Sequence, residues 1–349
     1  MASTPQQLRG ISRHNYLHKI YYDSIKNYPK PINFDATNSD FDIFENVTEG
    51  NYFEPEIKFL KNVRISTNSV VFTYFKIFRD SCIGEENYQK YQKGFRFFLK
   101  FIFPKLNFSK KRFLLITDEW TSNYYHWHVF ALKKLLILKE KNLLENSLLF
   151  LPKKYQNYPF VFPSLAKFGI KKEQIIFLCR KSNIKTKELA LVNAPQQHQQ
   201  YFEQIRKTLR NDFEANKKIY VSREDQVLRF IENEQEVSDL LAQYGFKKII
   251  AEKLSYAEQI AIFSKTKYLV SPHGAGLTNI FFMPEDSSIL ELATELPTAD
   301  YYKLSALLRI KYFYQKCNFG SRSKIKDPHH GSLLVDLEKL EKNLKLMLA

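Results

Sequence analysis

The chain has 349 residues, of which 44% are hydrophobic, so it can form one large domain or two of ordinary size. No apolar run approaches the roughly 18 residues of a transmembrane helix, and the first residues lack the apolar segment of a secretory signal. Cys82, Cys179 and Cys317 show no metal-ligand spacing, and their sparse, odd number argues against a disulfide framework.

The net charge of +16 favours partners that carry negative charge, such as nucleic acid, anionic lipid or phosphorylated ligands. The basic residues are spread along the chain and are densest over 105–112 and at Arg180 and Lys181. No zinc-finger spacing and no RNA-binding signature accompany them. Two interpretations remain open: solvated lysines on helix faces, or attraction of a diphosphate donor and an anionic membrane or lipid-linked acceptor.

The N-terminal 60 residues are polar and aromatic, and we expect a helix near 11–26 followed by irregular packing. Asp40 and Asp42 form a DxD triplet, a pattern that holds a divalent ion in metal-dependent transferases. Because the triplet lies in a turn-rich stretch and not at a strand end, we interpret it as a coincidence.

From residue 61 to 195, strands and helices alternate. Apolar runs predict strands over 113–117, 147–151 and 175–178, and the three-to-four spacing of apolar residues predicts a helix over 124–141. The polar stretch 181–197 is interpreted as a connector.

A second alternating unit follows, with helices predicted over 199–210, 234–244, 255–264, 299–308 and 333–348 and strands over 218–221, 246–250 and 311–315. Ser255 and Glu258 form a capping box at the start of the third of these segments. Alternation of this kind favours an α/β protein with two doubly wound domains, 1–195 and 196–349. For the last helix, packing back on the first domain stays open as an alternative.

The segment 267–292 has the layout of a nucleotide site. A strand over 268–270, stopped by Ser271 and Pro272, leads into the turn His273-Gly274-Ala275-Gly276 and a predicted helix over 277–283. Glycines at such a turn let a ligand approach the backbone, and the first N–H groups of a helix attract anions. A further strand over 288–290 ends at Glu291, at a distance from Gly274 where acidic residues commonly bind ribose. The plainer alternative is that the turn only joins two elements and that His273 packs or caps.

Three segments together resemble glycosyltransferase family 61. They are the sequence from Asn123 to Trp127, the sequence from Tyr220 to Arg223 with Arg229 and the helix start near 233, and 271–284 with 289–292. The resemblance implies an inverting transferase of the GT-B architecture, in which two Rossmann-like domains face each other across a cleft. It also implies that the C-terminal domain binds the nucleotide sugar and that no metal is needed.

The residues can be assigned roles in such a transfer. Arg223 offers a bidentate contact to the donor diphosphate, the turn Gly274, Ala275 and Gly276 offers N–H groups, and His273 lies beside it. Thr278 and Asn279 can add hydrogen bonds, and Glu291 can bind the ribose. The alternative for Arg223 is a surface ion pair with Glu224 or Asp225.

The general base is expected in the first domain. Asp118 follows a strand, and His126 lies in the first turn of the next helix, whose positive end favours a neutral imidazole. The alternative is that Asp118 caps and that His126 packs the helix against the sheet.

We expect no cofactor, a donor linked to UDP, a glycan or lipid-linked acceptor and no nucleic acid partner. The missing signal favours a cytoplasmic enzyme of surface polysaccharide synthesis, associated peripherally with the inner face of the membrane. Two rival functions stay open: a nucleotide-sugar epimerase of GT-B architecture, and a non-catalytic protein that binds nucleic acid or acts as a scaffold.

Overall fold

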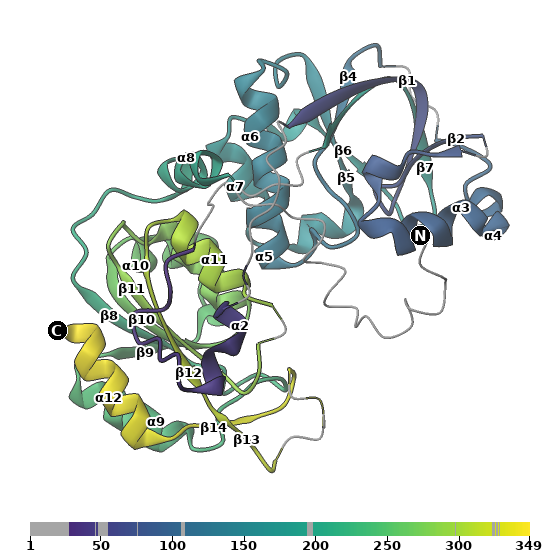
Figure 1. Ribbon diagram of the computed structural model, residues 1–349. Helices are drawn as coiled ribbons and strands as arrows, with labels where there is room; N and C mark the ends of the chain where they lie inside the picture. Colours follow the sequence, from purple (N-terminus) through teal and green to yellow (C-terminus); the bar gives the residue numbers. More distant parts are fainter. Residues whose placement is uncertain are drawn as a thin grey trace. The chain divides into compact units, whose positions relative to one another are not determined.

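The computed structural model describes residues 28–45, 47, 55–74, 76–105, 109–193, 198–296, 298–322, 325, 327 and 329–349. The predicted helix at 11–26 lies outside them. The described residues divide into two compact units. The first holds residues 55–193, and the second holds residues 28–45 together with 198–349 (Figure 1).

The sheet of the first unit is mixed. Its strands, in the order β3-β2-β1-β7-β4-β5-β6 among the described residues, are β1 (Glu56–Ser66), β2 (Val71–Thr73), β3 (Lys76–Ile77), β4 (Arg112–Leu115), β5 (Ser147–Pro152), β6 (Ile175–Leu178) and β7 (Asn183–Asn193). The neighbours β7-β4-β5-β6 are parallel, whereas β1 pairs antiparallel with both β7 and β2. The prediction of parallel strands is therefore correct for only one part of this sheet.

Strand β7 corrects the connector predicted over 181–197. Its first half is mostly polar and its second half is the apolar run 189–192, and Ile184, Leu189 and Leu191 enter the core of the first unit. The partner that buries them is β1, whose residues pair with β7 from Glu56 to Ser66. Local polarity concealed a strand that forms only with a partner more than a hundred residues away.

The helices of the first unit are α3 (Gly84–Lys93), α4 (Phe95–Lys100), α5 (Tyr124–His126), α6 (Leu132–Glu140) and α7 (Val161–Lys167). One π-helical turn, Trp127–Ala131, joins α5 to α6 into the helix predicted over 124–141. Asn123 caps it by accepting a hydrogen bond from the Tyr125 N–H. Short 3-10 turns lie between these elements at Arg79–Ser81, Lys153–Asn157 and Lys172–Gln174.

The sheet of the second unit is parallel throughout its described strands, in the order β12-β11-β10-β8-β9. These are β8 (Lys217–Val221), β9 (Lys247–Ile249), β10 (Thr266–Pro272), β11 (Ser288–Ala293) and β12 (Lys311–Lys316). Helices α9 (Glu234–Gln243) and α12 (Leu337–Leu348) pack together over a core of β8, β10, β11 and β12 residues. Helices α8 (Gln199–Leu209), α10 (Tyr256–Phe263) and α11 (Asp300–Leu307) pack around η8 (Ala275–Phe282) on the other face (Figure 1).

Several boundaries in the second unit differ from the prediction. Strand β10 continues through Pro272, which pairs only on the β11 side, so its missing N–H breaks no ladder with β8. The helix expected over 277–283 is the 3-10 helix η8. The expected helix over 333–348 begins at Leu337, because Leu333 and Leu334 form β14 against β13 (Asn318–Phe319). The capping box of α10 is confirmed.

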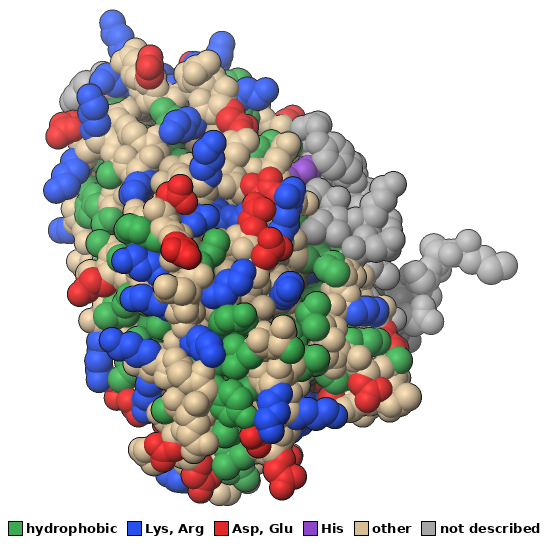
Figure 2. Space-filling model, turned by 90° about the vertical axis from the view of Figure 1, so that its left-hand side faces the viewer, with side chains coloured by type: hydrophobic (Ala, Val, Ile, Leu, Met, Phe, Trp, Pro, Cys, Tyr) green, Lys and Arg blue, Asp and Glu red, His purple; other side chains and the backbone are tan. Residues whose placement is uncertain are grey.

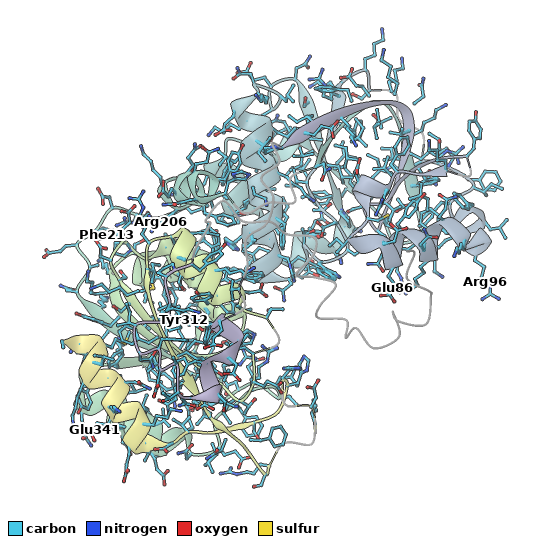
Figure 3. The ribbon with its side chains drawn as sticks, in the orientation of Figure 1. Glu86, Arg96, Arg206, Phe213, Tyr312 and Glu341 are labelled. Atoms are coloured by element: carbon cyan, nitrogen blue, oxygen red, sulfur yellow. The ribbon has the colours of Figure 1, made fainter. Side chains whose placement is uncertain are left out.

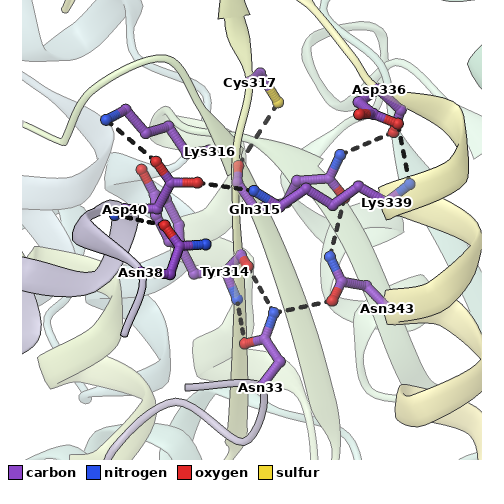
Figure 4. Close-up of polar contacts among 10 residues, drawn as sticks. All are labelled: Asn33, Asn38, Asp40, Tyr314, Gln315, Lys316, Cys317, Asp336, Lys339 and Asn343. Carbon is purple, nitrogen blue, oxygen red and sulfur yellow. Dashed lines mark hydrogen bonds and ion pairs between the residues drawn. The ribbon is translucent and has the colours of Figure 1, made fainter. Parts of the chain in front are cut away.

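Residues 28–45 cover β12, the edge strand of the second sheet. The Ile32 N–H donates to the Tyr312 carbonyl, and the Asn33 side chain both donates to and accepts from the backbone of Tyr314 (Figure 4). Two short helical turns follow, η2 (Ser39–Phe41) and α2 (Asp42–Glu45). Covering an edge in this way removes open hydrogen-bonding groups.

Asp40, from the DxD triplet, also stabilises this contact. Its carboxylate lies 2.8 Å from the Lys339 Nζ and 3.3 Å from the Lys316 Nζ (Figure 4). The two lysines hold the pKa of Asp40 below its usual value, although its partial burial opposes them. The triplet thus contributes an ion pair within the second unit.

Basic side chains lie among acidic and hydrophobic ones over the face in Figure 2. In the described part of the chain, the helices are too short or too polar to cross a membrane.

Candidate functional site

The carboxyl ends of β8 and β10 meet at one edge of the second sheet, where both strands are followed by predicted site residues. Arg223 lies in the loop after β8, and His273 follows β10 directly. Glu291 comes from β11 and is registered with Ser271. Edges of this kind are where open parallel sheets bind ligands.

Two half-buried arginines lie together at this edge. The Arg223 guanidinium donates to the Leu228 carbonyl from Nη2 at 3.1 Å, which closes the loop after β8. Arg229 comes from the same loop with φ 57°, and its Nη1 donates to the His273 carbonyl at 3.5 Å. Its Nε is buried without a hydrogen-bond partner among the described residues. Partial burial lowers the pKa of both groups, and Arg229 lowers that of Arg223 further, so the pair forms a partly desolvated cationic site.

Gly274 lies against the Arg223 guanidinium, where a side chain would not fit. Its φ of 153° belongs to a region that only glycine adopts readily. A Cβ at this position would lie 2.5 Å from the Arg223 Nη1. Gly276 is less constrained, since a Cβ there would lie 3.2 Å from the Val221 Cγ1. The turn therefore brings the backbone against the guanidinium.

Two buried polar residues of η8 lie just after the glycine turn, and one of them is hydrogen-bonded to it. Thr278 and Asn279 are fully buried in η8. The Asn279 Nδ2 donates to the Gly276 carbonyl at 3.0 Å, and the Thr278 hydroxyl lies 3.5 Å from that of Tyr301. The N-terminus of η8, from Ala275 onward, leaves its first N–H groups beside the cationic site.

His273 and Glu291 form a buried hydrogen-bonded pair. The two Glu291 oxygens accept hydrogen bonds from the His273 Nδ1 at 2.5 Å and from the Tyr312 hydroxyl at 2.6 Å (Tyr312 is labelled in Figure 3). Glu291 is 1% exposed, whereas His273 is 8% exposed. A carboxylate can only accept hydrogen bonds, so the Glu291 partner places a proton on the His273 Nδ1. The second ring nitrogen, Nε2, can then contact a ligand.

The first unit contains a separate cavity of about 620 Å³. It lies where its parallel strands end: Asp118 and Glu119 follow β4, Lys153 and Lys154 follow β5, and Arg180 follows β6. The β1–β2 turn, Thr67–Ser69, and Tyr91 of α3 complete part of the wall. This volume is within the range of ligand sites, about 300–1,000 Å³.

Asp118 and Glu119 differ in their surroundings although they are adjacent. One Asp118 oxygen accepts from the N–H groups of Trp120 and Thr121, and the other lies 3.0 Å from the Lys134 Nζ. One Glu119 oxygen accepts from the Ile83 N–H at 3.1 Å, while the other is buried with no hydrogen-bond partner among the described residues. Burial raises the pKa of the Glu119 carboxyl to about 7, helped by the nearby Asp118.

His126 is half-buried among aromatic rings. Its ring stacks on Phe130 at 5.4 Å between centroids and is tilted against Trp120 at 5.3 Å. Asp118 and Glu119 are among the described residues that line the cavity of the first unit, and His126 is not among them. The structure thus brings one of the two predicted bases to the cavity.

Sequence reasoning left three of these residues without a role. Arg229 lies six positions after Arg223 in the same loop, and this proximity was a usable signal. Glu119 is adjacent to Asp118, but nothing local showed which carboxyl is desolvated. Tyr312 reaches Glu291 only through the pairing of β11 with β12.

Comparison with known proteins supports the same segments. Residues 124–290 match the family model of glycosyltransferase 61. The EGF domain-specific O-linked N-acetylglucosamine transferase of Drosophila melanogaster is 30% identical over 95 residues, which is 27% of this chain. The match spans only 18% of that relative's length. The residues that match this family model, just under half of the chain, include the loop of both arginines and the glycine turn.

Proposed function

We propose that this protein is an inverting, metal-independent glycosyltransferase. It would move a sugar from a nucleotide-sugar donor, expected to be linked to UDP, to a glycan or lipid-linked glycan acceptor in the synthesis of surface polysaccharide. The observation that carries the proposal is the pair of half-buried arginines against the Gly274 turn.

The leaving group of such a transfer is a nucleoside diphosphate, and negative charge develops on it as the sugar departs. Arg223 and Arg229 supply two guanidinium groups for this charge, and the start of η8 adds N–H groups. Because the two cations are already partly desolvated, less reorganisation is needed when the diphosphate binds. Fixed positive charge from two arginines supports a mechanism that needs no divalent ion.

His273 is proposed as the side chain that contacts the donor. Glu291 and Tyr312 would hold its ring and its proton, because Glu291 is buried and both of its oxygens accept hydrogen bonds within the protein. This modifies the ribose contact expected for Glu291. A buried carboxylate that orients an imidazole is a common arrangement at functional sites.

The general base and the acceptor are proposed to belong to the first unit, with Asp118 and His126 as the residues expected from the sequence. The two α/β units, each with polar residues at the carboxyl ends of parallel strands, support a GT-B architecture. Basic side chains on the surface support peripheral attraction to anionic lipid.

The donor site can be tested by calorimetric titration with UDP. We expect Arg223→Ala and Arg229→Ala each to weaken binding by about 2–3 kcal/mol, the magnitude of a lost contact to a charged group. Arg112→Ala is the control, because this arginine is paired with Glu188 in the first unit. UDP affinity that is equal in the wild type and both site variants would reject the proposed site.

The reaction itself is tested by UDP release from UDP-sugars. A transferase releases UDP in proportion to added acceptor, whereas an epimerase converts the donor sugar without an acceptor. Donor interconversion in the absence of acceptor would favour the epimerase.

A further inference from the structure

Outside the proposed donor site, the feature that carries most information is the cavity of the first unit. It combines an unpaired buried carboxylate oxygen with basic side chains from two other strand ends. Neither of these features takes part in the donor site of the second unit.

The cavity wall contains three cations. Lys153 and Lys154 follow β5, and Arg180 follows β6. All three residues are exposed at the rim of the cavity, and partial burial of the Lys154 ammonium group lowers its pKa. The Asp118 carboxylate forms its ion pair with Lys134, so it does not neutralise the charge of these three cations through a direct contact. The cavity therefore favours a ligand that carries negative charge.

The rest of the wall is rich in neutral hydrogen-bonding groups. Asn68, Gln156 and Asn157 contribute amides, and Thr67 and Tyr91 contribute hydroxyls. Amides and hydroxyls are suited to sugar hydroxyl groups, since each can both donate and accept. Combined with the cations, they fit a sugar that bears a carboxylate or a phosphate.

Glu119 is the group in this cavity best suited to accept a proton. Its Oε1 has no hydrogen-bond partner among the described residues, whereas both Asp118 oxygens are used by the turn and by Lys134. The charged and titratable groups around Glu119 are Asp118, Lys134, Cys82 and Tyr91. Burial raises its pKa to about 7, which matches the requirement for a general base that works near neutral pH.

We propose that this cavity is the acceptor site, that it takes an anionic sugar, and that Glu119 is the catalytic base. The acceptor hydroxyl gives its proton to the Glu119 carboxylate, its oxygen forms the bond to the anomeric carbon, and the bond from that carbon to the diphosphate breaks with its electron pair on the leaving phosphate. Asp118 is then a positioning residue that fixes the turn carrying Glu119. This inference rests on the proposed transferase function.

The charge preference is tested by titrating the full chain with glucose, glucuronate and glucose 6-phosphate. We expect the two anionic sugars to bind at least 10-fold more tightly than glucose. Comparing the affinities for glucuronate and glucose 6-phosphate then shows whether the cavity prefers a carboxylate or a phosphate. Lys154→Gln and Arg180→Gln should reduce this preference, whereas Lys172→Gln, at an equally exposed position outside the cavity, should not. Equal affinities for glucose and both anionic sugars would overturn the anionic acceptor.

The role of Glu119 is tested by the chemical shift of its carboxyl carbon and by turnover. Binding of the preferred anionic sugar should shift this signal, and Glu119→Gln should lower acceptor-dependent UDP release by about 100-fold or more. Glu119→Asp should recover part of the rate, and Glu119→Gln should still bind UDP like the wild type. An unchanged signal, or a loss of turnover in Asp118→Asn but not in Glu119→Gln, would overturn Glu119 as the base.

The two levels of inference fail differently. If the wild type does not bind UDP, the transferase function fails. If UDP binds normally but the anionic sugars bind no better than glucose, only the acceptor inference fails.

Discussion

The ionisation of Glu119 should make the first unit less stable as the pH rises. In the unfolded chain a glutamate has a pKa near 4.5, whereas in the folded protein burial raises that of Glu119 to about 7. Below pH 4.5 the group is protonated in both states and has no effect on the free energy of unfolding. Between these values only the unfolded chain has ionised, so stability falls with rising pH, and above pH 7 the loss is complete.

The size of this effect follows from the shift. At 1.36 kcal/mol per pKa unit, a rise from 4.5 to about 7 corresponds to about 3 kcal/mol. Glu119→Gln removes the charge but keeps an oxygen that can accept from the Ile83 N–H. We expect the variant to be more stable than the wild type by up to about 3 kcal/mol at pH 8, with a much smaller difference at pH 4.

Urea unfolding of both proteins at pH 4 and pH 8, followed by a probe in the first unit, measures the difference. Glu86→Gln is the control for loss of one charge, because Glu86 is an exposed residue of α3 in the same unit (Figure 3). Titration of the Glu119 carboxyl carbon by NMR checks the pKa directly. A midpoint near 4.5, or a Gln variant with no gain in stability from pH 4 to pH 8, would refute the reasoning.

Three further predictions concern the glycine turn, the hydrogen bonds of Glu291 and the need for a metal. Gly274→Ala should weaken UDP binding by at least 10-fold in calorimetry, because its Cβ would displace the Arg223 guanidinium, and Gly276→Ala should have a smaller effect; similar affinities for the two variants would contradict this. Tyr312→Phe should lower the free energy of unfolding by about 1–3 kcal/mol, measured by urea unfolding, because Glu291 loses a buried hydrogen bond; a variant as stable as the wild type would show that the bond contributes little. Sugar transfer should persist in excess EDTA, and a complete loss that manganese or magnesium restores would overturn the metal-independent mechanism.

The sequence by itself determined most elements of the second unit. Strands β8, β10, β11 and β12 lie within a few residues of their predicted bounds, and the α10 capping box is present as expected. Such features are local: an apolar run, a glycine or a capping residue acts on neighbours within a few positions, whatever the rest of the chain does. The same local patterns placed Arg223 and His273 at the ends of their strands.

Only the tertiary structure decided which polar groups are buried and what they contact. Strand β7 depends on β1, the edge strand β12 is covered by residues 28–45, and the Glu291 oxygens are used by His273 and Tyr312. The difference between Asp118 and Glu119 likewise comes from the burial of Glu119 and from the ion pair of Asp118 with Lys134, and both depend on how the chain folds around them. Desolvation and hydrogen bonding depend on distant segments brought together by folding, so the spacing of residues along the chain could not predict them.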